Sequence, residues 1–367
     1  MKDEPNDSAA VTRVAEGAAD TAGASPAVSV VVPAYNVAPY IAGVLESVFA
    51  QTFTDYEVII VNDGSPDTEE LERALAPYRE RLVYLKQENA GPSAARNAGI
   101  RRARGSYVAL LDGDDEWLPT YLEEQLAALA DGLDLVYTDA LLFGEGELVG
   151  RTFMQTCPSR GPVTVESLLA QRCAVITSCV VARRESLVAA GLFNEDYRRS
   201  EDFDLWVRMA HGGARLGYRR KVLARHRMRG DSLAADQTRM HEAARGVYAE
   251  LARTLELTPR ERAAIEVEMA NYEFDLALAR AKRALAAGEY ALAGEELARA
   301  RGLGRASVLR SLKLRLALLC LSAAPRLTRR FYLRRSADAR PRATLQDGDA
   351  TCPSHAGEAN KDAHGTL

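Results

Sequence analysis

The sequence predicts an α/β fold in which a mostly parallel, Rossmann-like sheet carries helices on both faces and is followed by an α-helical C-terminal region. Two observations predict it. Between residues 28 and 111, short apolar runs alternate with segments whose apolar residues recur at helical spacing, which is typical of a parallel sheet buried on both sides. From Thr258 to about Leu333 the spacing is helical almost throughout.

The predicted elements follow one another in strand and helix order. Residues 28–32 are a β-branched run that ends at Pro33, and a helix is expected after Pro39, because proline suits a first helical turn. After residue 118 the alternation becomes less regular. The predicted strands are 28–32, 57–61, 82–85, 107–111, 133–137 and 175–182. The predicted helices begin after Pro39 and Pro92 and cover 69–78, 119–130 and 201–211.

Composition divides the 367 residues into four parts. Residues 1–26 and 339–367 are small and polar with little to bury, so both are predicted to be disordered tails. Residues 27–240 are predicted to form the α/β domain, and residues 241–338 the helical C-terminal region.

Charge is unevenly distributed along the chain. The formal net charge of -4 gives no general attraction for nucleic acid, so no nucleic-acid partner is expected. Between residues 301 and 342, however, many residues are basic and the only acidic residue is Asp338. They are Arg301, Arg305, Arg310, Lys313, Arg315, Arg326, Arg329, Arg330, Arg334, Arg335, Arg340 and Arg342. This block indicates a surface for anionic membrane lipid, and a basic helical cap packed on the α/β domain or on a second subunit is the alternative.

The cysteines and the apolar runs indicate the cellular compartment of the protein. The five cysteines are odd in number and lack the paired spacings of zinc sites, so cytosolic thiols are the simplest account. The N-terminus contains no uninterrupted apolar stretch, which argues against a secretory signal. The run 316–321 falls far short of the roughly 20 residues that span a bilayer. We therefore expect a cytoplasmic protein without a transmembrane helix, at the inner face of the membrane if the basic block binds lipid.

Polar residues follow three of the predicted strands. Ligands of such sheets bind outside the carboxyl ends of the strands, so these residues are expected to share one rim and a nucleotide-sized pocket. The carboxylates after the fourth strand suit a hard divalent cation, and Gly113 lets the backbone approach a large ligand. A plain acidic turn is the alternative. The residues are Pro33, Ala34, Tyr35, Asn36, Asn62, Asp63, Gly64, Ser65, Asp112, Gly113, Asp114 and Asp115.

Two helix starts carry further candidates. Residues 89–93, with Gly91 and Pro92, open a helix whose exposed N–H groups can hold an anion. Arg96 in its first turns could reach a nucleotide, or could simply be solvated. Glu201 and Asp202 begin the helix 201–211, where a carboxylate can act as general base or merely favour the helix dipole.

Together these stretches resemble the family 2 glycosyltransferases of the GT-A fold. The resemblance rests on five blocks in the family's order, residues 30–36, 61–65, 89–97, 111–115 and 200–206. It implies that residues 27–240 form a GT-A domain, which transfers a sugar from a nucleotide-diphosphate donor to an acceptor hydroxyl with inversion at the anomeric carbon. It covers nothing beyond about residue 235.

The resemblance also implies roles for the donor-site residues. Asp63 would recognise uracil, Arg96 would bind the donor and Asp112 would hydrogen-bond the ribose. Asp114 would ligate the Mn²⁺ or Mg²⁺ that bridges the two phosphates, with His226 as a further ligand. The remaining donor-binding residues would be Pro33, Ala34, Tyr35, Asn36, Asn89, Gly113 and Arg227.

Three of these assignments carry a qualification of their own. Gly113 stands where the family often has serine or alanine, and the change is expected to be harmless. Tyr35 could pack instead of contacting the nucleotide. Arg227 and His226 would lie in a loop that closes over the diphosphate.

For catalysis, the resemblance makes Asp202 the base that takes the proton from the acceptor hydroxyl. Glu201 would lie beside it and could bind the acceptor. The sequence leaves open which of the two carboxylates is the base.

Other activities fit the sequence less well. A dinucleotide-binding oxidoreductase needs a glycine fingerprint after the first strand, where residues 33–36 stand instead. A nucleotidyltransferase and a catalytically inactive scaffold remain as alternatives. The expected function is an inverting, metal-dependent transferase. It is expected to use a nucleotide-sugar, with a UDP-sugar as the expected donor, and a glycan or lipid-linked acceptor in cell-surface or extracellular glycan synthesis.

Overall fold

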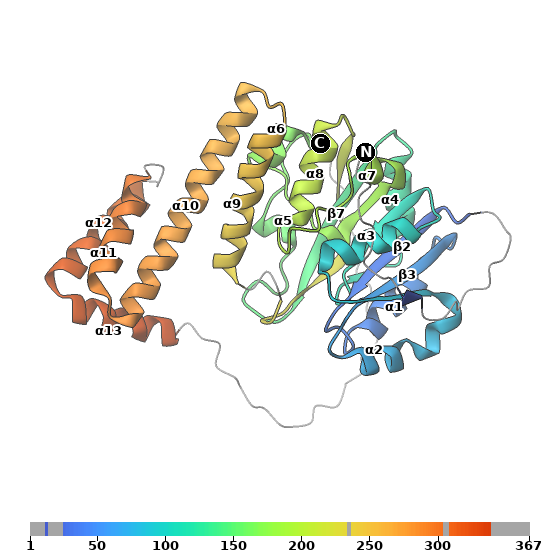
Figure 1. Cartoon of the computed structure of the whole chain (residues 1–367), viewed down its shortest axis with the longest axis horizontal. Coiled ribbons are helices and arrows are strands. Elements are labelled where there is room, and N and C mark those ends of the chain that lie inside the picture. The colour runs from blue at the N-terminus through green and yellow to red at the C-terminus, as the bar shows by residue number, and fades with distance from the viewer. Residues whose placement is uncertain (1–11, 14–24, 233–235, 304–307, 339–367) are drawn as a thin grey trace, which may run out of the picture.

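The computed structural model describes residues 12–13, 25–232, 236–303 and 308–338 (Figure 1). Its strands are β1 Thr12–Arg13, β2 Val28–Ala34, β3 Tyr56–Asp63, β4 Val83–Gln87, β5 Tyr107–Leu110, β6 Glu116–Trp117, β7 Leu135–Gly144, β8 Val180–Arg183 and β9 Leu216–Met228. Within the described residues they form one nine-stranded sheet in the order β1-β4-β3-β2-β5-β8-β7-β9-β6. Parallel ladders join β4, β3, β2 and β5, and also β7 and β9, while β1, β6 and β8 pair antiparallel. The expected mostly parallel sheet is confirmed.

Helices cover both faces of this sheet. They are α1 Ile41–Phe49, α2 Thr68–Leu75, α3 Pro92–Arg102, α4 Tyr121–Leu129, α5 Phe153–Thr156, α6 Val165–Leu169, α7 Arg184–Ala189, α8 Glu201–His211 and α9 Gln237–Thr254. Because strand side chains alternate, Val30 and Val32 of β2 pack with α1, α2 and α4, whereas Val31 packs with α3, α7, α8 and α9 on the other face. Two apolar clusters therefore hold the sheet between them.

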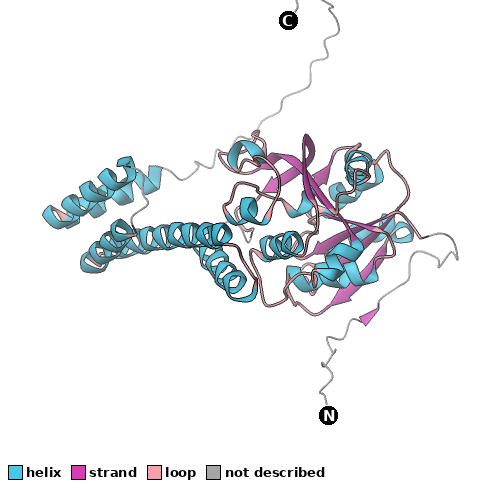
Figure 2. Ribbon diagram, turned by 90° about the horizontal axis from the view of Figure 1, so that it is seen from above, coloured by secondary structure: helices cyan, strands magenta, loops and turns pink. Residues whose placement is uncertain are grey.

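Four longer helices complete the chain: α10 Pro259–Ala287, α11 Tyr290–Gly302, α12 Val308–Ala323 and α13 Pro325–Asp338. Thr258 and Glu261 form a reciprocal capping box at the start of α10, and Gly288 ends it in a left-handed conformation with φ 87°. Ile265 of α10 packs into the core beneath α8 and α9, whereas Ala277, Ala281 and Ala284 pack with α11 and α12. The helix thus connects the sheet domain to a helical arm (Figures 1 and 2).

The structure differs from the sequence expectation at two strands, β1 and β9. Thr12 and Arg13, placed in a disordered tail by composition, pair with β4, and the rest of 1–24 and 339–367 lies outside the described residues. The strand β9 was not expected, because its stretch Tyr218–Arg219–Arg220–Lys221 lacks an apolar alternation. Its charged side chains are met by acids of neighbouring elements, as in the pairs of Lys221 with Glu124 and of Arg225 with Glu116.

Candidate functional site

The polar loops after β2, β3 and β5 meet at one rim of the sheet, as expected for parallel neighbours. The Asn36 backbone N–H donates to Ser65 Oγ at 2.7 Å, which joins the first two loops. A Cβ placed on Gly113 would lie 3.0 Å from the Pro33 carbonyl oxygen and 2.9 Å from Val37 Cγ2. Glycine therefore lets the loop after β5 approach the end of β2 closely.

The Asp63 carboxylate is buried at the end of β3 and faces the loop before α3. Its Oδ1 accepts hydrogen bonds from Ala90 N and Gln87 Nε2, and its Oδ2 accepts one from Gly91 N, each at 2.8 Å. An ionised carboxylate offers about four acceptor positions. Three of these positions are used, so Asp63 fixes the loop that opens α3, and one acceptor position remains.

The other residues of this rim that were predicted to bind the nucleotide-sugar differ in their exposure. Tyr35 has half of its surface exposed. Asn89 is exposed and lies against Gly64, whose φ is +61°. Ala34 is buried in the core, and Pro33 is half-buried beside it.

The Arg96 guanidinium is buried and connects the rim to α8. Nη2 donates to Asp112 Oδ1 and Nη1 donates to Glu201 Oε1, both at 2.7 Å. Burial raises the pKa of Asp112, but the Arg96 charge outweighs it and holds that pKa below its usual value. The solvated arginine considered as an alternative is therefore wrong. Arg96 positions Asp112 and Glu201, which stand 89 residues apart in the sequence, at one place.

Asp202 lies next to Glu201 in the first turn of α8, on the same side of the sheet as Asp112. Its Oδ2 accepts a hydrogen bond from Thr177 Oγ1 at 3.0 Å, and its Oδ1 accepts one from Phe203 N at 2.7 Å. Burial and the neighbouring Glu201 raise its pKa to about 6, against the opposing effect of Arg96. Glu201 already forms an ion pair with Arg96. Asp202 is therefore the carboxylate better suited to exchange a proton near neutral pH.

Asp115 is fully buried and holds β9 against the loop after β5. Its Oδ1 accepts from Arg227 N at 2.7 Å, and its Oδ2 lies 2.9 Å from His226 Nδ1. Burial lowers the pKa of His226, but the negative charges of Asp115, Asp112 and Asp114 outweigh this effect. The pKa of His226 is therefore raised to about 9. Because Nδ1 faces Asp115, Nε2 is the ring nitrogen that could face a metal, as in carboxylate–histidine–metal arrangements.

Asp114 lies close to two other carboxylates, Asp115 and Asp112. Burial, Asp115 and Asp112 raise its pKa to about 6, although Arg229 lowers it. Among the described residues, no group of three or more His, Cys, Asp or Glu side chains could hold a metal ion by itself. Mg²⁺ and Mn²⁺ commonly take only one or two carboxylates and complete their coordination with substrate phosphates. The Asp114 carboxylate suits such a cation, and His226 could join it only as the neutral imidazole, after losing a proton.

Arg227 does not lie in a loop, as the resemblance implied, but within β9. Its Nε donates to the Asp114 carbonyl oxygen at 2.9 Å, and its guanidinium lies 4.7 Å from the Tyr40 ring centroid and 4.2 Å from that of Phe143. These contacts fix Arg227 in the packing of the strand. The arginine that reaches the Asp114 carboxylate is Arg229, which the sequence analysis did not single out.

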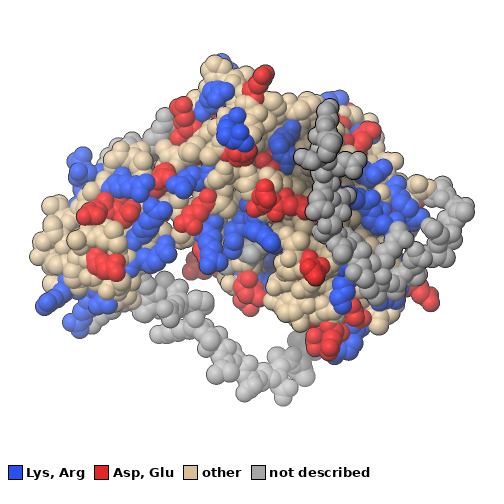
Figure 3. All heavy atoms as spheres, in the orientation of Figure 1, with Lys and Arg blue, Asp and Glu red and all other residues tan. Residues whose placement is uncertain are grey.

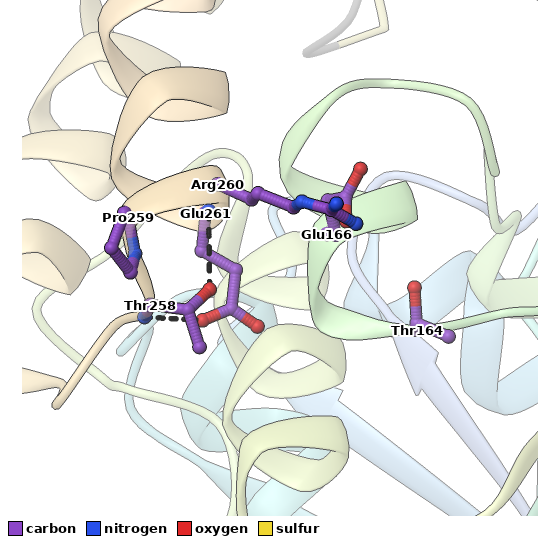
Figure 4. Close-up of a pocket in the computed structure, with 6 residues that line it drawn as sticks. All are labelled: Thr164, Glu166, Thr258, Pro259, Arg260 and Glu261. Atoms are coloured by element: carbon purple, nitrogen blue, oxygen red, sulfur yellow. Dashed lines mark hydrogen bonds between the residues drawn. The ribbon is translucent and has the colours of Figure 1, made fainter.

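Two surface hollows lie away from these residues. One, of about 600 Å³, is lined by Thr164, Glu166, Thr258, Pro259, Arg260 and Glu261 (Figure 4). Its Thr258 and Glu261 side chains bond the backbone at the start of α10, so they cap the helix. The other, of about 330 Å³, lies around Tyr218 and Lys221. Neither hollow contains a predicted site residue.

Known sequences are similar to part of this chain. Residues 29–187 match the family described as Glycosyl transferase family 2. An uncharacterized glycosyltransferase of Rickettsia felis is 32% identical over 191 residues, which make up 50% of this chain and 31% of that protein. The uncharacterized glycosyltransferase EpsJ of Bacillus subtilis is 46% identical over 91 residues, or 24% of this chain and 26% of that protein. The chain thus spans less than two thirds of these relatives' length.

Solved structures are similar over a larger part of the chain. Residues 1–349 of S. aureus TarS in complex with UDP-GlcNAc give a TM-score of 0.54 at 19% identity, covering 85% of this chain and 92% of that one. The mannosyltransferase PcManGT from Pyrobaculum calidifontis in complex with GDP-Man and Mn²⁺ gives 0.57 at 21% identity, covering 86% and 87%. At such identities the likeness shows a shared fold.

Proposed function

Because residues 29–187 form a family 2 glycosyltransferase domain of GT-A fold, we propose that the protein is an inverting glycosyltransferase that uses a UDP-sugar. One observation carries the proposal: Arg96 joins Asp112 of the rim to Glu201 of α8, which brings Asp202 beside the proposed donor site. A donor bound along the rim would then have a general base next to it.

The donor is proposed to lie along the rim from Asp63 to Asp114. The remaining acceptor position of Asp63 suits the N3–H of uracil, and Tyr35 offers an exposed ring at the same edge. Asp112, kept ionised by Arg96, would accept hydrogen bonds from the ribose hydroxyls. Asn36 and Asn89 would border the nucleotide from the loops after β2 and β4.

Asp114 and His226 would hold Mn²⁺ or Mg²⁺, which when bound would neutralise the charge that develops on the departing diphosphate. Asp202 takes the proton from the acceptor hydroxyl. Thr177 fixes the orientation of that carboxylate through its Oγ1, and Arg96 holds Glu201 so that it does not rotate away. Glu201 is proposed to contact the acceptor, not to act as the base.

The test is transfer or hydrolysis of UDP-sugars by the purified chain with Mn²⁺ present. Asp202→Asn is expected to reduce turnover by about 10²- to 10⁴-fold, the usual contribution of a general base, while UDP affinity stays within about twofold. Asp196→Asn, an exposed acid ahead of the same helix, is the matched control and should leave both unchanged. Absence of turnover in the wild type would favour the inactive scaffold, and equal turnover in Asp202→Asn and wild type would contradict the role of Asp202 as the base.

The preference for the nucleobase of the donor is tested by thermal shift with Mn²⁺ and a panel of nucleotide-sugars. A ligand bound by the folded state alone raises Tm. The expected result is stabilisation by UDP and UDP-sugars that Asp63→Asn abolishes. Stabilisation by GDP-sugars alone would contradict the uracil assignment, and turnover of nucleoside triphosphates with release of pyrophosphate would favour a nucleotidyltransferase.

The acceptor is proposed to be a glycan or lipid-linked molecule of cell-surface or extracellular glycan synthesis, which the enzyme meets at an anionic membrane. Among the described residues, no helix is long and apolar enough to cross a membrane. The outer helices of the arm, α12 and α13, expose apolar side chains next to basic ones. Figure 3 shows Lys and Arg side chains on the surface of the arm. The apolar side chains are Leu316, Leu319, Leu327 and Phe331, each at least 60% exposed, with the exposed Arg315, Arg326 and Arg330. This combination suits a lipid surface of negative charge.

Membrane contact is tested by co-sedimentation with vesicles that contain phosphatidylglycerol or only phosphatidylcholine. Wild type is expected to bind the anionic vesicles, and the double variant Leu327→Ser/Phe331→Ser to lose that binding at unchanged Tm, because both side chains are exposed. Leu292→Ser, an exposed leucine of α11, is the control. Binding that ignores lipid charge and survives deletion after residue 304 would contradict the proposal, as would a dimer that buries these helices.

A further inference from the structure

Arg229 lies directly after β9, and its guanidinium is held from several sides at the rim of the sheet. Nη1 donates to Asp114 Oδ2 at 3.0 Å, and Nη2 donates to the Asn36 carbonyl oxygen at 3.3 Å. Asp231 accepts from Nε at 2.9 Å and from Nη2 at 2.8 Å. The guanidinium also lies 4.7 Å from the Tyr40 ring centroid. Only 12% of the side chain is exposed, so this arginine has a defined position.

The position of Arg229 affects the proposed metal site, because Asp114 is the carboxylate proposed to hold the metal. Asp112 and Asp115 add negative charge around it, which the Arg229 guanidinium partly balances. A divalent cation that takes Asp114 as a ligand brings a second positive centre to the same carboxylate. Two positive charges this close to each other repel. The cation and the Arg229 guanidinium therefore weaken each other's interaction with the Asp114 carboxylate.

We infer that Arg229 is a built-in counter-cation of Asp114, which a divalent ion displaces, and that the displaced guanidinium then pairs with the diphosphate of the donor. The inference rests on the proposed function and adds to it a competition between a side chain and the metal. Asp114 would exchange one cation for another, and no covalent bond changes.

The surroundings of Arg229 favour a short movement over its complete release. Asp231 grips the guanidinium by two hydrogen bonds and is itself 60% exposed, in the segment that follows β9. It can keep the arginine at the rim while Nη1 leaves Asp114. The planar fork of arginine matches two phosphate oxygens, so a diphosphate at the rim would offer a replacement partner.

A consequence is that metal and nucleotide bind with positive coupling. The ion alone must compete with Arg229 for Asp114, whereas the ion together with the diphosphate gives the displaced arginine a new partner. By reciprocity, each ligand raises the affinity of the other by the same factor. Arg229 therefore acts as a positioning residue for both.

The experiment measures binding of Mn²⁺ alone, of UDP alone and of both together by calorimetry, with electron paramagnetic resonance of free Mn²⁺ as a second readout. Arg229→Met is expected to bind Mn²⁺ alone at least fivefold more tightly than wild type, and to bind UDP at saturating Mn²⁺ at least tenfold more weakly. Arg229→Lys keeps the charge without the fork, so its Mn²⁺ affinity should stay near that of wild type while UDP binding weakens.

Arg239→Met serves as the matched control, because Arg239 is also paired with a nearby aspartate, Asp236, but on the surface of α9. It should change neither affinity. Weaker Mn²⁺ binding in Arg229→Met would mean that the arginine orients Asp114 for the metal, and would overturn the inference. Unchanged affinities in Arg229→Met would overturn it as well. Wild-type protein that binds neither Mn²⁺ nor UDP would overturn the proposed function together with the inference.

Discussion

Asp202 is a carboxylate whose environment favours its protonated form, since burial and Glu201 raise its pKa to about 6. A base must be ionised to accept a proton, so kcat/KM is expected to fall about tenfold per pH unit below about pH 6 and to level off above it. The Thr177 hydrogen bond stabilises the ionised form, so Thr177→Val should move this limb to higher pH. A pH–rate profile measures both, and a flat profile between pH 5 and 7 would contradict the assignment.

The same shift predicts how Asp202 affects stability. Its folded pKa lies above the ordinary value of 3.8, so its favourable contribution is complete below about pH 4 and is lost as pH rises through about 6. At pH 7.5 the charged carboxylate therefore destabilises the fold. Asp202→Asn should raise the free energy of unfolding at pH 7.5 by on the order of 1 kcal/mol, although it is expected to reduce turnover. Urea unfolding at pH 4 and 7.5 checks this, and an equal effect at both values would refute it.

At the scale of elements, the turn into α3 depends on Gly91. Its φ of 91° and ψ of 172° lie in a region that is essentially restricted to glycine, and its N–H donates to Asp63. Gly91→Ala should therefore lower the free energy of unfolding by about 1–3 kcal/mol and weaken UDP binding. The control is Gly246→Ala within α9, where a Cβ meets no atom within 4 Å and alanine should be neutral or stabilising by up to about 1 kcal/mol. Equal effects in the two variants would argue against this role of the turn.

At the scale of the whole molecule, the helical arm has an apolar cluster of its own. Its buried members come from α10, α11 and α12, separate from the two clusters that flank the sheet. Ala293→Arg, which places a charge at a buried site of α11, should melt the arm in a separate thermal transition and leave UDP-sugar hydrolysis unchanged. Leu292→Arg, at the exposed neighbouring position, should have no effect. Loss of hydrolysis in Ala293→Arg would mean that the arm and the sheet domain unfold together.

Local patterns predicted much of this architecture because they depend on neighbouring residues. The structure confirms three local signals as β2, α1 and α3: the β-branched run at 28–32, the proline before α1, and the glycine before α3 with the proline that begins it. The helix 201–211 was predicted with the bounds that α8 has. The strand β9 escaped prediction because partners far away in the sequence balance its charges, so no apolar alternation was needed.

The sequence by itself determined that acids and glycines follow the strands of a parallel sheet, since strand ends and turns are written in consecutive residues. Only the tertiary structure decided which cation meets which acid. Arg96 lies between Asp112 and Glu201, Asp115 holds β9, and Arg229, not Arg227, reaches the carboxylate of Asp114. These pairings join residues up to 115 positions apart. Strand order and register bring them together, and a single sequence does not specify either of these through local spacing.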